Sequence, residues 1–407
     1  MSAPLLVEIV RTIARPVGEG ERKRARLHLL DWLACVAGAR QAPVAEIARS
    51  LPSAVDRAAL LGNVLEMDDI HRTALLHPAP VIWPAAFGAP DKGMDAALDA
   101  AVRGYQVMIA IGASLDARHY AHWHPTATAG LPGATAAAAS LFGLSEEQTL
   151  WAVANAASVA GGLWHMRHDA VMTKQWHVLH AVTSGTQAAR LAGAGLTGPA
   201  GVLDGPQGLF AAMTDNAAPM TLSADDWLID GVSFKPWAAC RHAHPAIDCA
   251  LELRGQGKLT APFAVATYAD ALTFCDRPDP RSEMEAKFSL QHAVAVIAAG
   301  RAAEAQDFTP AAIAELATLR AQVTVSEDPA ITARYPTHFG ARVNGLELID
   351  TRGDPERPVD LDAMLAKLRS LVAWGGLAPA EATRAATLAL EGSDAGALVT
   401  MLEDWLA

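Results

Sequence analysis

The spacing of apolar residues predicts a chain built mostly of helices. From Leu5 to about Asp230, apolar residues recur at intervals of three and four, with few β-branched runs. The segment 22–39 is one such helix, and the tetrapeptide that begins at Ser145 has the form of a capping box that opens another. We therefore expect a helical first part.

The pattern changes near Val232. The segments 263–274, 319–328, 341–343 and 346–350 are expected as strands. The last two flank an Asn-Gly pair, which is typical of a type I′ hairpin turn. Helical spacing returns from residue 360 to residue 405. The sequence therefore predicts a mainly α protein with a smaller α+β region before its helical C-terminal segment.

Composition narrows the class of protein. Hydrophobic residues make up 51% of the chain and charged residues 19%, which is typical of a globular protein. A formal charge of −12 opposes binding to nucleic acid or to an anionic membrane. No apolar run is long enough to span a bilayer, and no secretory signal opens the chain. We expect a cytoplasmic protein that does not bind nucleic acid or membranes.

The four cysteines do not have the spacing of a metal or cluster site. There is no CxxC pair, so neither a zinc ribbon, an iron–sulfur cluster nor a disulfide framework is indicated. The histidines are more suggestive, because 11 of 14 fall between His71 and His244. Candidate chemistry is therefore sought among them.

The first cluster of candidate residues lies in the segment 62–86. On a helix, Glu66, Asp69 and Ile70 would share one face, and His77 follows just before Pro78. The alternative is an exposed acidic helix start, because acidic residues favour the first turn of a helix.

The second cluster, in the segment 119–130, holds three histidines. Histidine is the side chain best suited to proton transfer near neutral pH. A metal site that uses His122, His124 and either Asp68 or Asp69 is the competing interpretation, but no HExxH-type spacing supports it.

Two further clusters contain cationic side chains. On a helix, Lys174, His177 and His180 would share a face, unless the lysine simply extends into solvent. The fourth cluster follows the change of pattern and contains Lys235, Arg241, His242 and His244. Such a position favours a ligand cleft, and the alternative is a structural corner. Arginine binds carboxylates through a bidentate fork.

Taken together, the motifs resemble those of the MmgE/PrpD family, which includes 2-methylcitrate dehydratase, cis-aconitate decarboxylase and iminodisuccinate epimerase. The resemblance covers most of residues 25–370, and its motifs occur in the order of the family. The matching stretches are EMDDIH, HPAPV, HYAHWHPTATAG, TKQWHVLHA, GLTGPAGVLDGPQGLF, KPWAACRHAHPAIDCA and EAKFSLQHAVA.

The resemblance implies a particular architecture. A large all-helical domain would be assembled from residues 1–231 and 358–407, with a smaller α+β lid domain formed by residues 232–357. The site would lie in the cleft between them, and a homodimer would be the usual assembly. No metal, iron–sulfur cluster or organic cofactor is expected.

The resemblance also implies the site residues and a reaction. His77, His124, Lys174 and His244 fall on the family's site positions. A lyase of this kind removes a proton alpha to a carboxylate of a small polycarboxylate substrate, with loss of water or carbon dioxide. The catalytic residues would be His124 or Lys174 as base and His77 or His292 as acid. The substrate-binding residues would be Glu66, Asp69, His177, Arg241 and His244.

Three positions depart from the family pattern. The family commonly has Asp at Glu66, Thr at Ile70 and Tyr at His292, so the substrate need not be 2-methylcitrate. One alternative is an isomerase or epimerase that uses His124 and Lys174 as two opposed bases. Another is a catalytically silent helical protein that binds a ligand, because fold does not imply function.

Overall fold

The computed structural model describes residues 3–169, 171–220, 222–223 and 225–407. The described chain divides into two compact units. Unit 1 comprises residues 1–64, 69–232 and 375–407, and unit 2 comprises residues 65–68 and 233–374. The expected fold class, mainly helical with a small mixed sheet, is confirmed. The expected domain boundaries at residues 231 and 358 stay a prediction. Helix α20, which begins at Leu361, groups with unit 2.

Unit 1 is entirely helical in its described part. Its α-helices are α1 (Leu5–Ile13), α2 (Glu19–Gly38), α3 (Pro43–Ala48), α4 (Ala54–Leu61), α5 (Ala79–Ala86), α6 (Met94–Ala113), α7 (Ala117–His122), α8 (Pro125–Thr128), α9 (Gly130–Phe142), α10 (Glu146–Ala157), α11 (Thr173–Gly193), α12 (Leu209–Met213), α21 (Pro379–Leu390) and α22 (Ala395–Leu406). Short 3₁₀ helices are Ala39–Gln41, Pro90–Lys92, Trp164–His168 and Leu228–Gly231.

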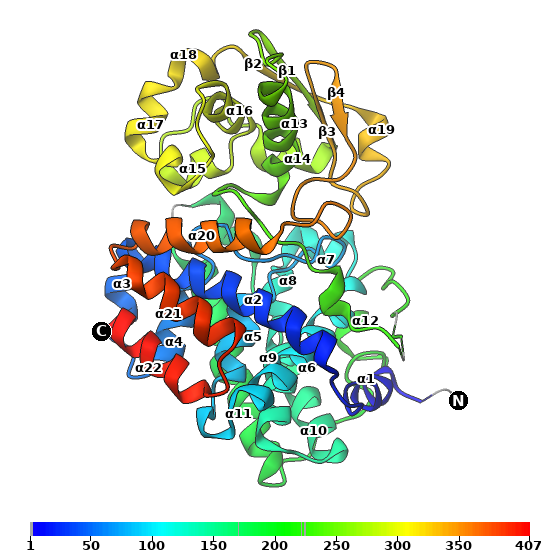
Figure 1. The fold of residues 1–407 in the computed structure, drawn as a ribbon. Coiled ribbons are helices and arrows are strands. Elements are labelled where there is room, and N and C mark those ends of the chain that lie inside the picture. The colour runs from blue at the N-terminus through cyan, green and yellow to red at the C-terminus, as the bar shows by residue number, and fades with distance from the viewer. Residues whose placement is uncertain (1–2, 170, 221, 224) are drawn as a thin grey trace. The chain divides into compact units, whose positions relative to one another are not determined.

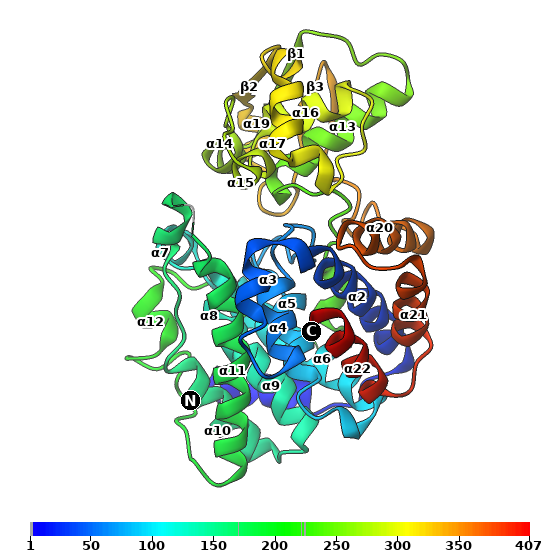
Figure 2. The same cartoon turned by 90° about the vertical axis from the view of Figure 1, so that its left-hand side faces the viewer.

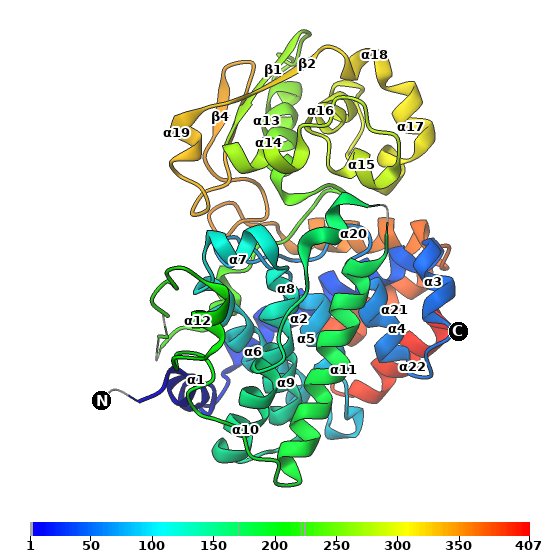
Figure 3. The same ribbon diagram turned by 180° about the vertical axis from the view of Figure 1, so that it is seen from behind.

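Helix α9 forms the centre of unit 1. It packs against α5, α6, α10 and α11 (Figures 2 and 3). Glycines permit the close approach: a Cβ added at Gly133 would lie 2.6 Å from Met108 Cβ, and one at Gly185 would lie 2.9 Å from the Leu131 carbonyl oxygen. Alanines fill much of the rest of α9, so the neighbouring helices approach its backbone closely.

The first and last parts of the chain meet in unit 1. Helix α21 packs against α2, and α22 packs against α4 (Figure 1). The predicted helix at 22–39 is confirmed as α2, and the capping box of Ser145 and Gln148 begins α10 as predicted.

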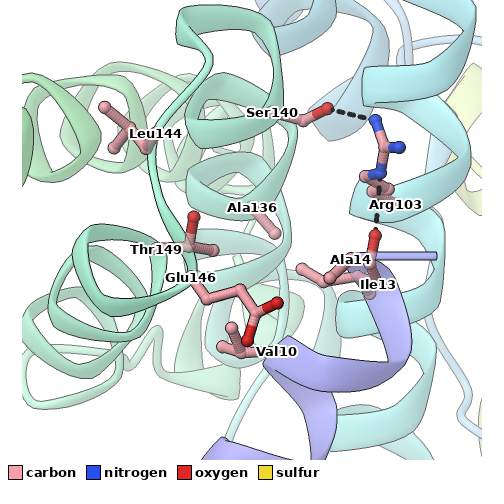
Figure 4. A pocket seen from close by; sticks show the side chains of 9 residues that line it. All are labelled: Val10, Ile13, Ala14, Arg103, Ala136, Ser140, Leu144, Glu146 and Thr149. Atoms are coloured by element: carbon pink, nitrogen blue, oxygen red, sulfur yellow. Dashed lines mark hydrogen bonds between the residues drawn. The ribbon is translucent and has the colours of Figure 1, made fainter. Parts of the chain in front are cut away.

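A small cavity of about 250 Å³ lies among α1, α6, α9 and α10 (Figure 4). Arg103 on its wall donates hydrogen bonds to the carbonyl oxygens of Ile13 and Arg15 and to Ser140 Oγ. The guanidinium therefore joins three segments of unit 1, and none of the predicted site residues lines this cavity.

Unit 2 contains a four-stranded mixed sheet with the order β2-β1-β3-β4. Its strands are β1 (Phe263–Thr267), β2 (Val323–Glu327), β3 (Ala341–Val343) and β4 (Leu346–Leu348). Its α-helices are α13 (His244–Gly255), α14 (Ala269–Cys275), α15 (Glu283–Lys287), α16 (Leu290–Ala298), α17 (Pro310–Glu315), α18 (Ala317–Arg320), α19 (Pro329–Thr332) and α20 (Leu361–Trp374), and Arg241–Ala243 and Ala305–Phe308 are 3₁₀ helices.

The sheet combines a parallel and two antiparallel pairings. β1 pairs in parallel with β2, and Val265 is opposite both Val325 and, on the antiparallel side, Val343. Helix α13 packs against β3 and β4, whereas α16 packs against β2. The predicted Asn-Gly hairpin joins β3 to β4, and both turn residues have positive φ, 43° at Asn344 and 89° at Gly345.

Three sequence predictions were wrong in detail. The segment 263–274 is a strand only to Thr267, and α14 then begins at Ala269. The segment 319–328 is a strand only from Val323 to Glu327, because Leu319 and Arg320 belong to α18. The segment between α4 and α5, residues 62–78, is not helical, and Glu66 has a left-handed φ of 57°. Its acidic side chains bind partners distant in sequence, which competes with local helix formation.

Two remaining observations concern membranes and cysteines. Among the described helices, none combines the length and the apolar character required to cross a bilayer. All four cysteines are buried free thiols.

Candidate functional site

The candidate residues of unit 1 gather around His124. This imidazole is 1% exposed, and its Nδ1 lies 3.2 Å from Nδ1 of His177 on α11. The backbone N–H of His124 donates to the Gly162 carbonyl oxygen, which fixes the residue at the start of α8. Within the described residues, Nε2 of His124 is buried without a hydrogen-bond partner. The ring therefore presents one nitrogen that is already engaged and one that is not.

Burial lowers the pKa of His124 well below its ordinary value of 6.5, and a nearby lysine and three nearby histidines lower it further. The largest of these charge effects comes from Lys174, followed by His177, His77 and His119. His124 is consequently neutral at pH 7. Burial also lowers the pKa of His177.

Lys174 lies in the first turn of α11, close enough to His124 to influence its ionisation. The N-terminal end of a helix carries a partial positive charge, so it favours an anion nearby. The lysine, the helix end and the neutral imidazoles together make this part of unit 1 suited to binding developing negative charge.

Asp69 holds His77 through its backbone carbonyl oxygen, whereas its carboxylate is bonded to other side chains and to the backbone. Its carboxylate accepts hydrogen bonds from Tyr105 Oη and His28 Nδ1, each at 2.7 Å, and from the Ala79 backbone N–H at 2.9 Å. Its carbonyl oxygen accepts from Nδ1 of His77 at 3.1 Å. Nδ1 of His77 therefore carries a hydrogen.

The candidate residues of unit 2 include a buried lysine, Lys235. Lys235 is fully buried, and its Nζ lies 3.6 Å from Asp68 Oδ1 and 3.8 Å from Glu66 Oε2. Within the described residues, this Nζ is buried without a hydrogen bond. Lys367 donates hydrogen bonds to the carbonyl oxygens of Met67 and Lys235, which ties the two segments together.

Arg241 and His244 belong to the same part of unit 2. Arg241 is 2% exposed, its Nη2 donates to Asp354, and its guanidinium lies over the Phe339 ring. Its Nε and Nη1 are buried without hydrogen-bond partners among the described residues. These nitrogens carry N–H groups that can each donate a hydrogen bond to a carboxylate.

His244 begins α13 as a neutral imidazole. Its Nε2 donates to the Ala239 carbonyl oxygen at 3.1 Å, which leaves a buried lone pair on Nδ1. Burial lowers the pKa of His244 well below 6.5, and the charges of Arg241, Lys235 and Lys367 lower it further.

His292 has a different environment from His244. Its Nε2 donates to the Asp307 carbonyl oxygen at 2.8 Å, and its ring packs edge-on against Phe308. Burial lowers its pKa to about 4. Within the described residues, neither Arg241 nor His244 appears among its bonded or charged neighbours.

Lys235 belongs to the same candidate cluster as Arg241 and His244, but little in the sequence indicates its partners. Lys235 stands among the apolar residues Phe234 and Trp237, which is a weak sign that it is buried. Nothing marks Lys367 on α20, or Tyr105 on α6, as partners of the site segments.

The metal alternative is not supported by the geometry of its proposed ligands. Both carboxylate oxygens of Asp69 are engaged by protein donors, and His122 is exposed. Among the described residues, the side chains close enough to share an ion are His338, Asp350 and Glu356 in unit 2. His338 Nδ1 lies 2.7 Å from Asp350 Oδ1, the distance of an ordinary hydrogen bond.

The fold and these two sets of titratable side chains define a mainly helical protein with buried neutral histidines beside lysine and arginine. Residues 52–221 match the MmgE/PrpD N-terminal domain, and residues 237–391 match the MmgE/PrpD C-terminal domain. The chain belongs to the MmgE/PrpD family, and the resemblance inferred from the motifs is confirmed.

Three curated relatives have similar sequences. Cis-aconitate decarboxylase of Homo sapiens is 33% identical over 182 residues, which is 42% of this chain and 37% of that protein. The Mus musculus protein of the same name is 33% identical over 185 residues, with the same two shares. A cis-aconitate decarboxylase-like protein, oryM, of Aspergillus oryzae is 31% identical over 166 residues, 37% of this chain and 34% of that protein. The matches thus span about a third of each relative's length.

Proposed function

We propose that this protein is a lyase that acts on a small polycarboxylate without a metal or organic cofactor. The observation that carries the proposal is the buried, neutral His124, with Nδ1 held by His177, Nε2 unengaged and Lys174 close by. The family membership and the names of the three relatives support the same class of reaction.

The chemistry requires a carbanion next to a carboxylate. In dehydration, a base takes the alpha proton, the C–O bond breaks, and an acid supplies a proton to the departing hydroxide. In decarboxylation, the C–C bond to one carboxylate breaks, its electron pair stays on the carbon chain, and an acid protonates that chain. Both routes create an enolate-like charge, which cationic groups must stabilise.

The contact between His124 and His177 determines which proton His124 can transfer. If His177 donates its Nδ1 hydrogen, neutral His124 carries its own hydrogen on Nε2 and acts as an acid. If His124 donates, its Nε2 has a lone pair and acts as a base. A shift of tautomer across this one contact therefore exchanges the two roles.

His77 is a better candidate for the second proton-transfer group than His292. With Nδ1 of His77 fixed by the Asp69 carbonyl, its Nε2 takes up or releases the proton. His292 is neutral at pH 7 and uses its N–H on Asp307, so it accepts a hydrogen bond more readily than it donates one. We assign His292 a binding role.

The carboxylates of the substrate are assigned to Arg241, with Lys235 and His244 as supporting groups. Arg241 offers two buried N–H groups and is held in place by Asp354. Glu66 faces Lys235, so its longer side chain, compared with the family's usual Asp, adjusts the position of that cation. Because Glu66, Ile70 and His292 all depart from the family pattern, several different polycarboxylates are candidate substrates.

The proposal is tested with five acids: cis-aconitate, citrate, 2-methylcitrate, malate and iminodisuccinate. Each is incubated with the purified protein, and proton NMR and carbon dioxide release are followed. We expect one acid to lose carbon dioxide or water. Inversion of iminodisuccinate without loss of a group would replace the lyase by an epimerase. No change in any acid, at micromolar protein over a day, would contradict the proposal.

A further inference from the structure

Trp164 lies against the imidazole that the proposed chemistry depends on. Its ring centroid is 4.6 Å from that of His124, and its edge contacts Tyr120 at a centroid distance of 6.1 Å. The indole belongs to the short 3₁₀ helix Trp164–His168 that precedes α11. The neighbouring residues Leu163 and His165 are exposed, whereas Trp164 is half-buried. The side chain thus anchors an otherwise exposed segment.

The backbone before Trp164 is fixed to the same histidine. The Gly162 carbonyl oxygen accepts the His124 N–H at 2.8 Å, and Leu163 forms an antiparallel bridge with Trp123. Gly162 has a φ of 114°, and a Cβ there would lie 2.5 Å from Ala127 Cβ. Only glycine allows this close approach, so the segment covers His124 in a defined position.

We propose that Trp164 is a positioning residue that covers His124, excludes water from its ring and so keeps it neutral. Its bearing on catalysis rests on the proposed function, whereas the exclusion of water does not. A neutral imidazole can donate or accept through Nε2, but an imidazolium cannot act as a base.

The other titratable groups around His124 act in the same direction. Lys174 and His177 come from α11, His119 from α7 and His77 from the loop before α5, and each lowers the pKa of His124. All four side chains remain when Trp164 is removed. A change on removing the indole therefore reports the loss of cover and not the loss of one of these groups.

The test is an NMR titration of the whole protein with histidine labelled at Cε1. The His124 resonance is identified by its absence in His124→Gln. In the wild type we expect no titration of His124 between pH 5.5 and 8. In Trp164→Leu its midpoint should rise by about one pH unit or more, toward the ordinary value near 6.5. Trp164→Phe, which retains an aromatic cover, should behave like the wild type.

Two further variants make the result specific. Gly162→Ala leaves the indole in place but displaces the segment, so it should raise the His124 midpoint as Trp164→Leu does. Trp176→Leu removes an exposed tryptophan of α11 and should leave the midpoint unchanged. Circular dichroism verifies that each variant is folded. If either Trp164→Leu or Gly162→Ala does not fold, the other one of these two variants is used for the comparison with the wild type.

The outcomes separate this proposal from the proposed function. If His124 titrates in Trp164→Leu as it does in the wild type, Trp164 does not shield it and the proposal is wrong. If the midpoint rises but none of the acids reacts, the shielding stands and the lyase assignment fails. If an acid reacts, the acid limb of kcat/KM should move upward in Trp164→Leu by the same amount as the NMR midpoint.

Discussion

Replacement of Lys174 by methionine is expected to lower kcat on the reacting acid by about a thousandfold, the usual loss when a group that stabilises or transfers charge in the transition state is removed. Methionine retains the length and the apolar stem of the side chain, so α11 should stay folded. The measurement is steady-state turnover, with unfolding followed by circular dichroism.

A matched control is available at the surface. Lys92 is exposed at the end of a 3₁₀ helix, and Lys92→Met should retain wild-type turnover. Retention of more than a tenth of the activity in Lys174→Met would remove this lysine from the mechanism.

The variant Lys174→Arg decides between the two roles of the lysine. Arginine keeps the positive charge but does not release a proton at any accessible pH. If Lys174 stabilises the enolate-like charge, Arg should recover at least about a tenth of the activity, because the electrostatic term is largely kept. If Lys174 is the base, Arg and Met should be equally inactive.

Acid is expected to destabilise this protein strongly between pH 7 and pH 5.5. Burial lowers the pKa of five histidines that are almost completely inaccessible and whose rings, unlike that of His28, form no hydrogen bond with a carboxylate among the described residues. The pKa values of His119 and His292 fall to about 4 and that of His242 to about 3, and those of His124 and His244 fall well below 6.5.

The direction follows from proton uptake by the two states. The unfolded chain binds protons at these histidines near pH 6.5, whereas the folded chain does not, so stability is complete above that pH and falls as the pH decreases. One pH unit below 6.5, each neutral buried histidine lowers the free energy of unfolding by about 1.4 kcal/mol. Five such groups together are comparable with the roughly 5–15 kcal/mol by which most proteins are stable.

Urea denaturation at pH 7.5, 6.5 and 5.5 measures this effect. The variant His119→Gln removes one titrating group, so its stability should decrease less steeply with falling pH. His165→Gln, at an exposed position, should follow the wild type. Equal stability at pH 7.5 and pH 5.5 would show that these imidazoles take up protons in the folded protein as readily as in the unfolded chain.

Local sequence signals predicted the helices well because those signals act over a few residues. The capping box at Ser145 and the Asn344-Gly345 turn both depend on neighbours in the chain, and both formed as expected. The segment 62–78 was misjudged because Asp69 binds Tyr105 and His28, which lie 36 and 41 positions away. The spacing of apolar residues does not indicate which residues make contact at such a separation in sequence.

The candidate site was predictable only in part for the same reason. The motifs selected His124 and His177, which the fold brings into contact across 53 positions. They gave no indication that Asp69 is saturated by protein donors, nor that Lys235 is the cation facing Glu66. The side chains that position a site are selected by packing, so they are visible only in three dimensions.

The central claim, proton transfer by side chains without a metal, is tested most directly by solvent labelling. The protein is treated with a chelator, transferred to deuterium oxide and incubated with the acid that it converts. We expect unchanged turnover. If carbon dioxide is lost, the product should carry deuterium at the carbon that is protonated, and if water is lost, the alpha hydrogen of the acid should pass to the solvent. Loss of turnover that a divalent cation restores, or a decarboxylated product free of deuterium, would contradict the account.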